Sequence, residues 1–348
     1  MVRRAHVTIA EIAKRAGVHP STVSRALTPA PGTRLSNATT ERIVAIAAEL
    51  GYQPDQAAAA LRTGRSGALG VIVPRLTDYV LARIYEGIDE AAQRAGYQTV
   101  VTNSNDDAAL RLTKLDELLA RRIEGVIVGD ARLDGDDLAQ TLDRKFIPHV
   151  LVNRRLRGHL SVTTDDVLGG KLAARHLLDL GITKPAVLAG PSYVSTCVER
   201  THGFVGRFLS SGVDVDDDCV VESAPDAEGG YVAAGQLLDT HPEIEAIFAI
   251  NDFAAIGAMG AAREHGRTPG RDIAVIGYND IPLARHLPVP LTSVTSPMLQ
   301  MGIEGANRLC QLLAGEHVES VRLPPTLSVR ESTEGLRHPN ESPVQQFG

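Results

Sequence analysis

The sequence lacks the cysteine patterns of a disulfide framework or a thiolate metal site. Its three cysteines, Cys197, Cys219 and Cys310, are odd in number and far apart along 348 residues. Isolated thiols of this kind are typical of a reducing compartment. We therefore expect a cytoplasmic protein whose cysteines are buried and take no part in its chemistry.

Long apolar runs are absent as well. Hydrophobic residues make up an ordinary 43% of the chain, but no uninterrupted run approaches the ~20 residues of a membrane span. Arg3 and Arg4 near the start are not followed by an apolar segment, so the pattern does not fit a secretory signal. We expect no membrane partner, and the length fits two or three domains.

Motifs of the common catalytic sites are missing too. The sequence contains no G-x-x-x-x-G-K-[ST], no G-x-S-x-G and no H-E-x-x-H, and its eleven histidines are scattered. Gly129-Asp130 and residues 277–280 end predicted strands, but no nucleophile–base pair accompanies them. These absences predict a protein that is not an enzyme and that carries no cofactor and no metal ion.

Positive charge is scarce overall but is concentrated at one end. The net charge is −7, yet residues 1–66 hold nine Lys/Arg against four Asp/Glu, while the remainder holds 26 against 38. A basic segment of +5 attached to an acidic body of −12 would direct phosphate attraction to one end. The alternative is a chance fluctuation in a short segment.

The basic segment contains a helix-turn-helix pattern. Thr8 and Glu11 form a capping box that opens one helix, and Gly17 supplies a left-handed stop. Pro20 can open a second helix, since a first helical residue needs no N–H. The outer face of that helix is polar and carries Arg25, which is long enough to reach a guanine edge in the major groove.

The amino-acid sequence of this segment is a more specific signal than the spacing of its two helices. Residues 8–27, TIAEIAKRAGVHPSTVSRAL, closely resemble the DNA-binding head of the LacI/GalR family of bacterial repressors, as do a third helix capped by Ser36 and the exit LGYQP at 50–54. Two features depart from the family. His19 stands where a serine cap is usual, which predicts a weaker cap, and the loop at 28–35 is about two residues longer.

The resemblance implies which residues contact DNA. The base-reading positions are those of Pro20, Ser21 and Arg25, while side chains at four further positions would contact phosphates. These four are Thr8, Thr22, Ser24 and Thr39. For each hydroxyl, a solvated helix face is the alternative.

An alanine-rich segment follows the head. The segment 54–62 is too short to form a stable helix alone, and the simplest interpretation is a spacer. The family resemblance implies a hinge helix that orders on operator DNA. In it, Leu61 enters a minor-groove step, with Ala58 and Arg62 beside it.

From residue 67 onward, short apolar runs alternate with amphipathic stretches. Strands are predicted at Ala68–Pro74, Gln98–Asn103, Gly125–Gly129, His149–Asn153, Pro185–Ala189, Ala246–Asn251 and Ile273–Tyr278. Helices are predicted at Ala82–Ala95, Ala109–Arg121, Leu168–Leu180, Gly229–Thr240 and Ala254–His265. This alternation indicates an α/β fold with parallel sheets, which bind ligands at the carboxyl ends of their strands.

Dispersed motifs in this region match the same family in the same order. Among them are ALGVIVP at 68–74, RIEGVIV at 122–128, Asp165-Asp166, Arg200 and IGYND at 276–280. The resemblance covers residues 8–333. It implies the fold of the periplasmic sugar-binding proteins, with two doubly wound parallel-sheet subdomains joined by three crossovers near Thr163, Ser293 and Thr326.

Together these patterns predict the domain organisation. A helix-turn-helix domain occupies 1–51, a hinge helix and linker 52–66, an effector-binding and dimerisation domain 67–333, and a polar tail 334–348. Within the third of these, the N-subdomain takes about 67–163 and 294–326, and the C-subdomain about 164–293 and 327–333.

Carried over by position, the resemblance also implies an effector site. Its residues are Arg200, Asn105, Asn153, Asn251 and Asn279, with Val80 and Leu81 as an apolar wall. Guanidinium and amide groups at strand ends suit a hydroxyl-rich ligand. Asn153 and Asn279 stand where family members often have Asp, so a different hydroxyl pattern is expected. Turn formation is the alternative for these asparagines.

The resulting hypothesis is a DNA-binding transcriptional regulator, a repressor by family habit, located in the cytoplasm at the nucleoid. A homodimer would bind a pseudo-palindromic operator, and a small sugar, polyol or nucleoside would set its affinity. The tail lacks a leucine heptad, which favours a dimer over a tetramer. Two alternatives stay open: a regulator controlled by a protein partner or by no effector, and a ligand-binding protein without a DNA function.

Overall fold

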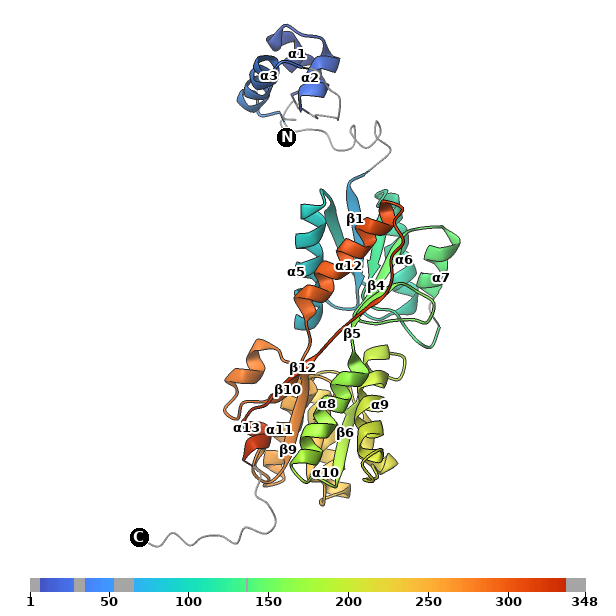
Figure 1. The fold of residues 1–348 in the computed structure, drawn as a ribbon, viewed down its shortest axis with the longest axis vertical. Coiled ribbons are helices and arrows are strands. Elements are labelled where there is room, and N and C mark those ends of the chain that lie inside the picture. Colours follow the sequence, from blue (N-terminus) through green and yellow to red (C-terminus); the bar gives the residue numbers. More distant parts are fainter. Residues whose placement is uncertain (1–6, 28–34, 53–65, 136, 336–348) are drawn as a thin grey trace, which may run out of the picture. The chain divides into compact units, whose positions relative to one another are not determined.

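The computed structural model describes residues 7–27, 35–52, 66–135 and 137–335. They divide into two compact units, Met1–Ser66 and Gly67–Gly348, which we call the head and the body (Figure 1). The predicted hinge contacts Ala58, Leu61 and Arg62 lie outside the described residues, as does the tail from residue 336.

The described residues of the head form a bundle of three helices. They are α1 (Ile9–Ala16), α2 (Pro20–Leu27) and α3 (Asn37–Glu49). The predicted capping box is confirmed, because Thr8 Oγ1 accepts from Glu11 N at 3.3 Å and Glu11 Oε2 accepts from Thr8 N at 2.7 Å. Ile12, Val23 and Ile43, one from each helix, are fully buried, so these helices share one small core.

His19 closes the start of α2. Its ring atom Nδ1 accepts from Ser21 N at 3.2 Å and lies 2.8 Å from Ser21 Oγ. An accepting Nδ1 places the hydrogen of a neutral ring on Nε2. The imidazole thus caps α2 at the position where the family usually has serine.

The body contains two six-stranded sheets, one in each of two lobes. The N-lobe sheet has the order β11-β5-β4-β3-β1-β2 and is parallel throughout. Its strands are β1 (Ala68–Val73), β2 (Gln98–Asn103), β3 (Gly125–Val128), β4 (His149–Val152), β5 (Ser161–Thr164) and β11 (Val321–Leu323).

The C-lobe sheet has the order β12-β10-β9-β8-β6-β7. Its strands are β6 (Pro185–Ala189), β7 (Val220–Glu222), β8 (Ala246–Ala249), β9 (Ala274–Asn279), β10 (Thr292–Thr295) and β12 (Thr326–Ser328). All its pairs are parallel except β10 with β12, which is antiparallel. The sequence-based picture of purely parallel sheets therefore misses one edge strand.

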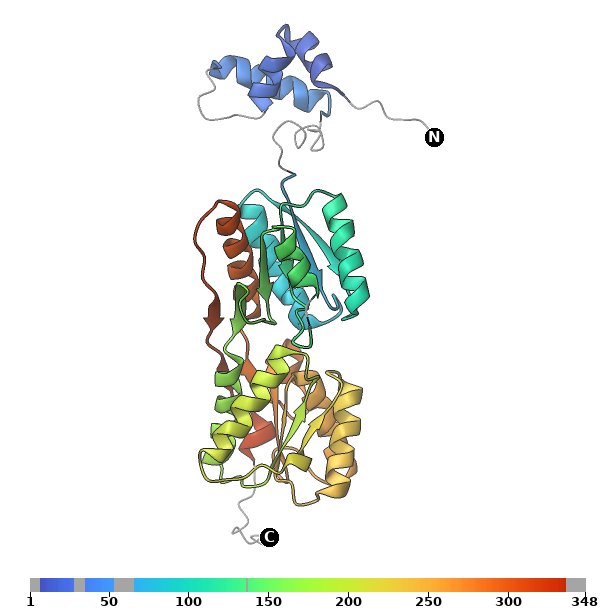
Figure 2. The same cartoon turned by 90° about the vertical axis from the view of Figure 1, so that its right-hand side faces the viewer.

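The chain passes between the lobes three times. It leaves the N-lobe after β5, returns after β10, and leaves again between β11 and β12. Because β11 and β12 are separated by only two residues, the last crossing is an almost continuous extended segment, visible as the dark red strand in Figure 2.

Helices cover both faces of each sheet. In the N-lobe, α5 (Tyr79–Arg94) and α12 (Met298–Leu313) pack on one face, and α6 (Ala108–Ala120) and α7 (Asp137–Arg144) on the other. In the C-lobe the pairs are α8 (Asp166–Asp179) with α9 (Ser195–Leu209), and α10 (Ala227–Thr240) with α11 (Asp252–Glu264). A short α13 (Glu331–Glu334) follows β12.

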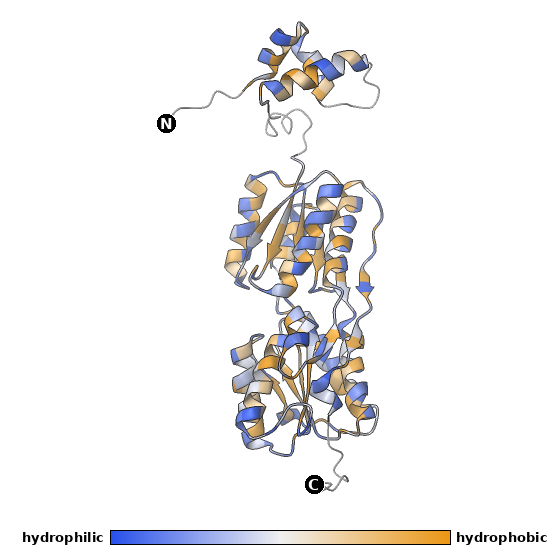
Figure 3. Cartoon of the chain, turned by 90° about the vertical axis from the view of Figure 1, so that its left-hand side faces the viewer, coloured by the Kyte–Doolittle hydropathy of each residue, from blue (hydrophilic) through white to orange (hydrophobic). Residues whose placement is uncertain are grey.

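Burial alternates along the strands in the way this layering requires. Val71 in β1 faces the α5 side, while its neighbour Ile72 faces the α6 side, and both are fully buried. Central strands such as β1 are accordingly apolar along their length, whereas the helices carry both apolar and polar residues (Figure 3). Among the described residues, no helix is long and apolar enough to cross a membrane.

Cys197 and Cys219 are buried as expected, but Cys310 is half-buried. It lies one position beyond Leu309, the last residue of the buried stripe of α12. The prediction that all three thiols are buried is therefore wrong for Cys310.

Glycines set the separation of the paired helices. A Cβ on Gly170 of α8 would lie 2.1 Å from Arg200 O, and one on Gly203 of α9 would lie 2.2 Å from Val167 O. Both distances are far below van der Waals contact, so each helix touches the backbone of the other where its partner has no side chain. This close approach holds Arg200 on α9 against the start of α8.

Gly203→Ala should therefore lower the free energy of unfolding by at least about 1–3 kcal/mol, because the added methyl meets backbone that cannot rotate away. Gly206→Ala on the same helix is the matched control, since its Cβ would have no neighbour within 4 Å. There the change should be neutral, or stabilising by up to about 1 kcal/mol. Urea unfolding followed by circular dichroism measures both, and equal effects would refute the close-packing argument.

Candidate functional site

The predicted base-reading residues share one exposed face of α2. Pro20 is the first residue of the helix, and Ser21 and Arg25 follow on the same side, all three exposed. Arg25 Nε donates to Ser21 O at 3.2 Å, a bond that does not use the terminal guanidinium nitrogens. These nitrogens are the atoms that pair with the two acceptors of a guanine edge.

Of the four predicted phosphate contacts, Thr8, Thr22 and Thr39 lie at or near helix starts, whereas Ser24 is the fifth residue of α2. Thr8 caps α1, and the hydroxyl of Thr39, in the first turn of α3, lies 2.8 Å from Ser36 Oγ. Thr22 and Ser24 are half-buried on α2. Helix N-termini present free N–H groups to anions, which suits phosphate contact, although Thr8 and Thr39 already have local partners.

In the body, the carboxyl ends of the strands of one lobe meet those of the other. Leu133 N, after β3, donates to Tyr193 O, after β6, at 2.8 Å. Arg155 N, after β4, donates to Ser195 Oγ at 2.9 Å, and the Arg155 side chain pairs with Glu199 at 2.5 Å. The guanidinium of Arg132 lies 3.7 Å from the centre of the Tyr193 ring. Parallel α/β sheets bind ligands at such ends.

Arg200 lies at this junction and is only 5% exposed. Its Nε donates to Asp166 Oδ1 at 2.7 Å, and its Nη1 donates to Ile250 O at 2.7 Å. The guanidinium also lies 3.6 Å from the centre of the Tyr278 ring. A buried cation fixed by this set of partners is a pre-organised donor, because its remaining N–H groups are already oriented.

The four predicted asparagines differ in their surroundings. Asn105, Asn153 and Asn279 have φ values of 54°, 65° and 98°, the left-handed region that asparagine tolerates in turns. Asn279 is also buried, and its Oδ1 has no hydrogen-bond partner among the described residues. Asn251 is different again: its Oδ1 accepts from Ala254 N and so caps α11, while its Nδ2 donates to Pro225 O in the loop before α10.

Val80 and Leu81 lie buried in the first turn of α5, directly after its cap Asp78. Burial raises the pKa of Asp78, while the positive charges of Arg154 and Arg200 act to lower it. Asp78 of the N-lobe is thus within electrostatic reach of Arg200 of the C-lobe. The sequence prediction missed Asp78, whose position before an apolar helix indicated only a cap.

A second fixed arginine stands on the N-lobe side. Arg154 forms a two-pronged ion pair with Asp106, with distances of 2.7 and 2.8 Å, and is 7% exposed. Arg132 Nη1 donates to the carbonyl of the same Asp106 at 3.1 Å. The loops after β2, β3 and β4 are therefore joined by charge. Arg154 directly follows the predicted effector residue Asn153, but its aspartate partner is 48 residues away and gave no sequence signal.

Two family models together match nearly all of this architecture. A model of bacterial regulatory proteins of the lacI family matches residues 8–55, and a model of periplasmic binding proteins and sugar binding domains of the LacI family matches residues 66–331. The chain belongs to the LacI family. The expected fold, a helix-turn-helix head with a body of two α/β subdomains, is thereby confirmed.

Relatives match over almost the full length. The HTH-type transcriptional regulator CelR of Thermobifida fusca is 33% identical over 95% of this chain and 100% of its own. A structure of the Lac repressor dimer bound to operator and the anti-inducer ONPF has a TM-score of 0.86 at 28% identity, covering 94% of this chain and 99% of that one. The CelR–cellobiose complex has a TM-score of 0.72 at 31% identity, covering 94% and 100%.

Membership of the LacI family settles the class of function. The chain is a DNA-binding transcriptional regulator and not an enzyme. The exposed face of α2 and the charged junction of the two lobes are therefore candidate binding sites for DNA and for a ligand.

One carboxyl group of this LacI-family body carries an unusual proton affinity. Asp252, the first residue of α11, accepts from Ser293 Oγ at 2.5 Å and from Ile281 N at 2.7 Å, and it is 1% exposed. Burial raises the pKa of Asp252 to about 7, against the lowering effect of both hydrogen bonds. Between its unfolded value of 3.8 and about 7, the folded protein therefore binds more protons than the unfolded chain.

The contribution of Asp252 to stability should accordingly be fully present below pH 3.8 and be lost as the pH rises to about 7. Asp252→Asn removes this dependence, and its amide can keep both hydrogen bonds. The stability of the unsubstituted protein relative to the variant should fall by up to about 1.4 kcal/mol per pH unit across this window. Urea unfolding at several pH values measures the difference, with the exposed Asp214→Asn as control. A rising difference would contradict the assignment.

Proposed function

We propose that this LacI-family regulator binds a pseudo-palindromic operator as a homodimer in the cytoplasm, and that a small hydroxyl-rich effector bound between its lobes sets operator affinity. The observation that carries the ligand site is Arg200. It is buried, held by Asp166 and Ile250 O, and stacked on Tyr278, at the strand ends where the lobes meet. The effector contacts are Arg200, Asn105, Asn153, Asn251 and Asn279, with Val80 and Leu81 as the apolar wall.

The chemistry of these side chains favours a sugar, a related polyol or a nucleoside. Fixed guanidinium and amide groups offer directional donors and acceptors to hydroxyls. The Oδ1 of Asn279 is buried and has no hydrogen-bond partner among the described residues, which is costly unless a ligand or water donates to it. The solved complex of the relative CelR contains cellobiose, which supports a carbohydrate ligand in this fold.

DNA recognition is assigned to the head and the segment that follows it. Pro20, Ser21 and Arg25 read bases, Thr8, Thr22, Ser24 and Thr39 contact phosphates, and the hinge contributes Ala58, Leu61 and Arg62. The operator complex of the Lac repressor, to which this chain is similar along 94% of its length, supports the assignment. Two heads in one dimer would match the two halves of a palindrome.

Ligand and operator communicate through the paired N-lobes. An effector that changes how the two lobes of each protomer meet would change the separation of the two hinges, and with it their ability to be helical on DNA. Such coupling is reciprocal, so the operator must change effector affinity by the same factor. A regulator controlled by a protein partner, or by none, would show no such effect of any small molecule, and a ligand-binding protein without DNA function would not bind an operator at all.

Replacing Arg25 tests the DNA assignment. Arg25→Ala should weaken binding to an operator in the DNA that flanks the protein's own gene by about 5- to 150-fold, equivalent to about 1–3 kcal/mol, and should relax the preference at one base pair. Lys14→Ala removes one positive charge from the same head. It should weaken binding to specific and to non-specific DNA by similar factors. Fluorescence anisotropy at fixed salt measures all four affinities. Equal behaviour of the two variants would argue against base reading by Arg25.

Replacing Arg200 tests the effector site. Lysine keeps the charge beside Asp166 but loses the planar fork, so Arg200→Lys should raise the effector concentration for half-maximal response at least about tenfold. Operator affinity without effector should stay unchanged, and Arg207→Lys on the same helix should behave like the unsubstituted protein. A panel of sugars and nucleosides is added in the anisotropy assay. Weakened binding identifies an inducer, tightened binding a co-repressor, and an unchanged response in Arg200→Lys would remove Arg200 from the site.

A further inference from the structure

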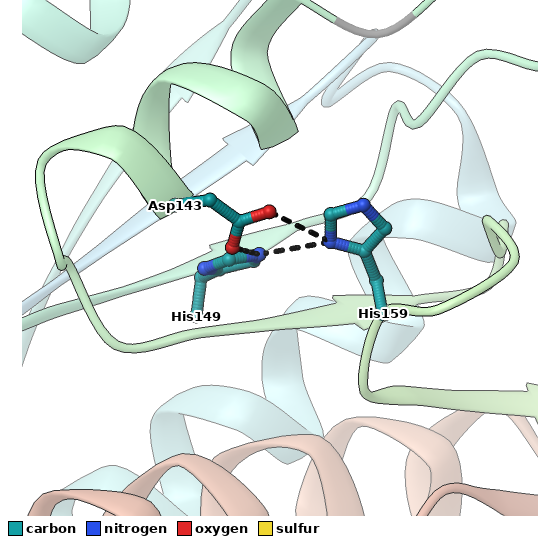
Figure 4. Close-up of side chains that lie close together, drawn as sticks. All are labelled: Asp143, His149 and His159. Atoms are coloured by element: carbon teal, nitrogen blue, oxygen red, sulfur yellow. Dashed lines mark hydrogen bonds and ion pairs between the residues drawn. The ribbon is translucent and has the colours of Figure 1, made fainter.

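Three potential metal ligands converge on the N-lobe, away from the strand ends that carry Arg200. Asp143 lies in the last turn of α7, His149 is the first residue of β4, and His159 lies in the connection from β4 to β5. Figure 4 shows that their side chains point toward one another. One ligand atom from each lies within 4.8 Å of the other two, and no other such group occurs in the part of the chain that the structure describes.

The ring of His149 is held in the form that binds metals. Its Nδ1 lies 3.0 Å from Ile147 O, a carbonyl that can only accept, so Nδ1 carries the hydrogen. The lone pair of the neutral ring is then on Nε2, the atom that faces His159 and Asp143. A hydrogen bond from the far ring nitrogen to a backbone carbonyl is the usual way in which a ligating histidine is oriented.

The spacing of the atoms fits a tetrahedral ion. His149 Nε2 and His159 Nδ1 are 3.4 Å apart. Two nitrogens each about 2.0–2.1 Å from a tetrahedral zinc ion would stand about 3.3 Å apart. Each carboxylate oxygen of Asp143 is 3.8 Å from one of these nitrogens. An oxygen bound to the same tetrahedral ion would stand about 3.3 Å from both nitrogens, so the exposed carboxylate would have to move toward the two rings.

The two histidine side chains of the site are largely buried, whereas the aspartate side chain is open to solvent. The side chains of His149 and His159 are 9% and 18% exposed, whereas that of Asp143 is 58% exposed. One imidazole held by a backbone carbonyl, a second partly buried imidazole and one exposed carboxylate leave a fourth position open to water. Imidazole and carboxylate together favour zinc and its divalent first-row neighbours over calcium or magnesium, which prefer sets made of oxygen alone.

The geometry points to a zinc-class divalent metal site formed by Asp143, His149 and His159. An ion bound there would join the end of α7 to two points on the next part of the chain. These are the start of β4, at His149, and the connection from β4 to β5, at His159. That connection also carries Arg154 and Arg155, which are fixed to Asp106 and to the C-lobe residues Ser195 and Glu199. The metal would therefore restrain the same segment that takes part in the junction of the lobes.

Zinc binding to the full chain tests this inference. The protein is freed of metal by chelation and titrated with zinc in competition with a chromophoric chelator. One equivalent per chain is expected, and Asp143→Asn and His159→Ala should each weaken it at least about tenfold. His202→Ala, at an exposed histidine of α9, is the matched control and should bind as the unsubstituted protein does. Asp143 is exposed, so its variant should fold, which circular dichroism verifies.

Cobalt supplies a second readout, because a four-coordinate cobalt ion absorbs visible light far more strongly than the hydrated ion. The unsubstituted protein should give this absorption and the Asp143→Asn variant should lose it. Absence of stoichiometric zinc binding would overturn the inference. Undiminished binding by both ligand variants would overturn it too, since the ion would then reside elsewhere, for instance on the half-buried Cys310.

Discussion

The burial of the Arg200 guanidinium is the constraint on which the arrangement of the C-lobe depends. A buried cation must be given a counter-charge and acceptors, and removing one partner typically costs several kcal/mol. Here Asp166 supplies the charge from α8, Ile250 O an acceptor from the end of β8, and Tyr278 an aromatic face from β9. Tyr278 fits only because Gly169 has no side chain, since a Cβ there would lie 2.1 Å from the tyrosine hydroxyl. One ion thus ties together the end of the sheet and both helices of one face.

Sequence patterns predicted the elements whose burial comes from their own apolar residues. The strands Gln98–Asn103 and Pro185–Ala189 have the predicted bounds, and α10 ends at the predicted Thr240. The strands β5 and β10 were missed because they are built largely from serine and threonine. These residues are buried only because distant partners satisfy them, as when Thr164 bonds Ser296 at 2.7 Å, or Thr292 bonds Thr333 at 2.8 Å. No local pattern predicts such pairs. The helices α7, α9 and α12 were also left out of the prediction.

The candidate sites divide in the same way. The types and places of the binding residues followed from motifs, but the partners that orient them did not, because Asp166 lies 34 residues from Arg200. Structure also distinguishes among the asparagines. A left-handed backbone alone accounts for asparagine at Asn105 and Asn153, and a helix cap accounts for Asn251. Of the four, Asn279 alone combines a left-handed backbone with a buried acceptor that has no partner in the described part of the chain, so it has the strongest physical reason to contact a ligand.

The polar contacts across the lobes are individually weak, and this matters for control. A single neutral hydrogen bond such as that from Leu133 N to Tyr193 O contributes about 0.5–1.5 kcal/mol. The binding free energy of a ligand, at several kcal/mol, can therefore offset the loss of a few such bonds. The connection from β4 to β5 would be acted on twice: by an effector near Arg154 and Arg155, and by an ion at its other end on His159. Two ligands that restrain one segment are coupled whenever each favours a particular arrangement of it, and the coupling is equal in both directions. On this argument a metal ion on the N-lobe need not touch the effector to alter its affinity; it need only change the freedom of the connection from β4 to β5.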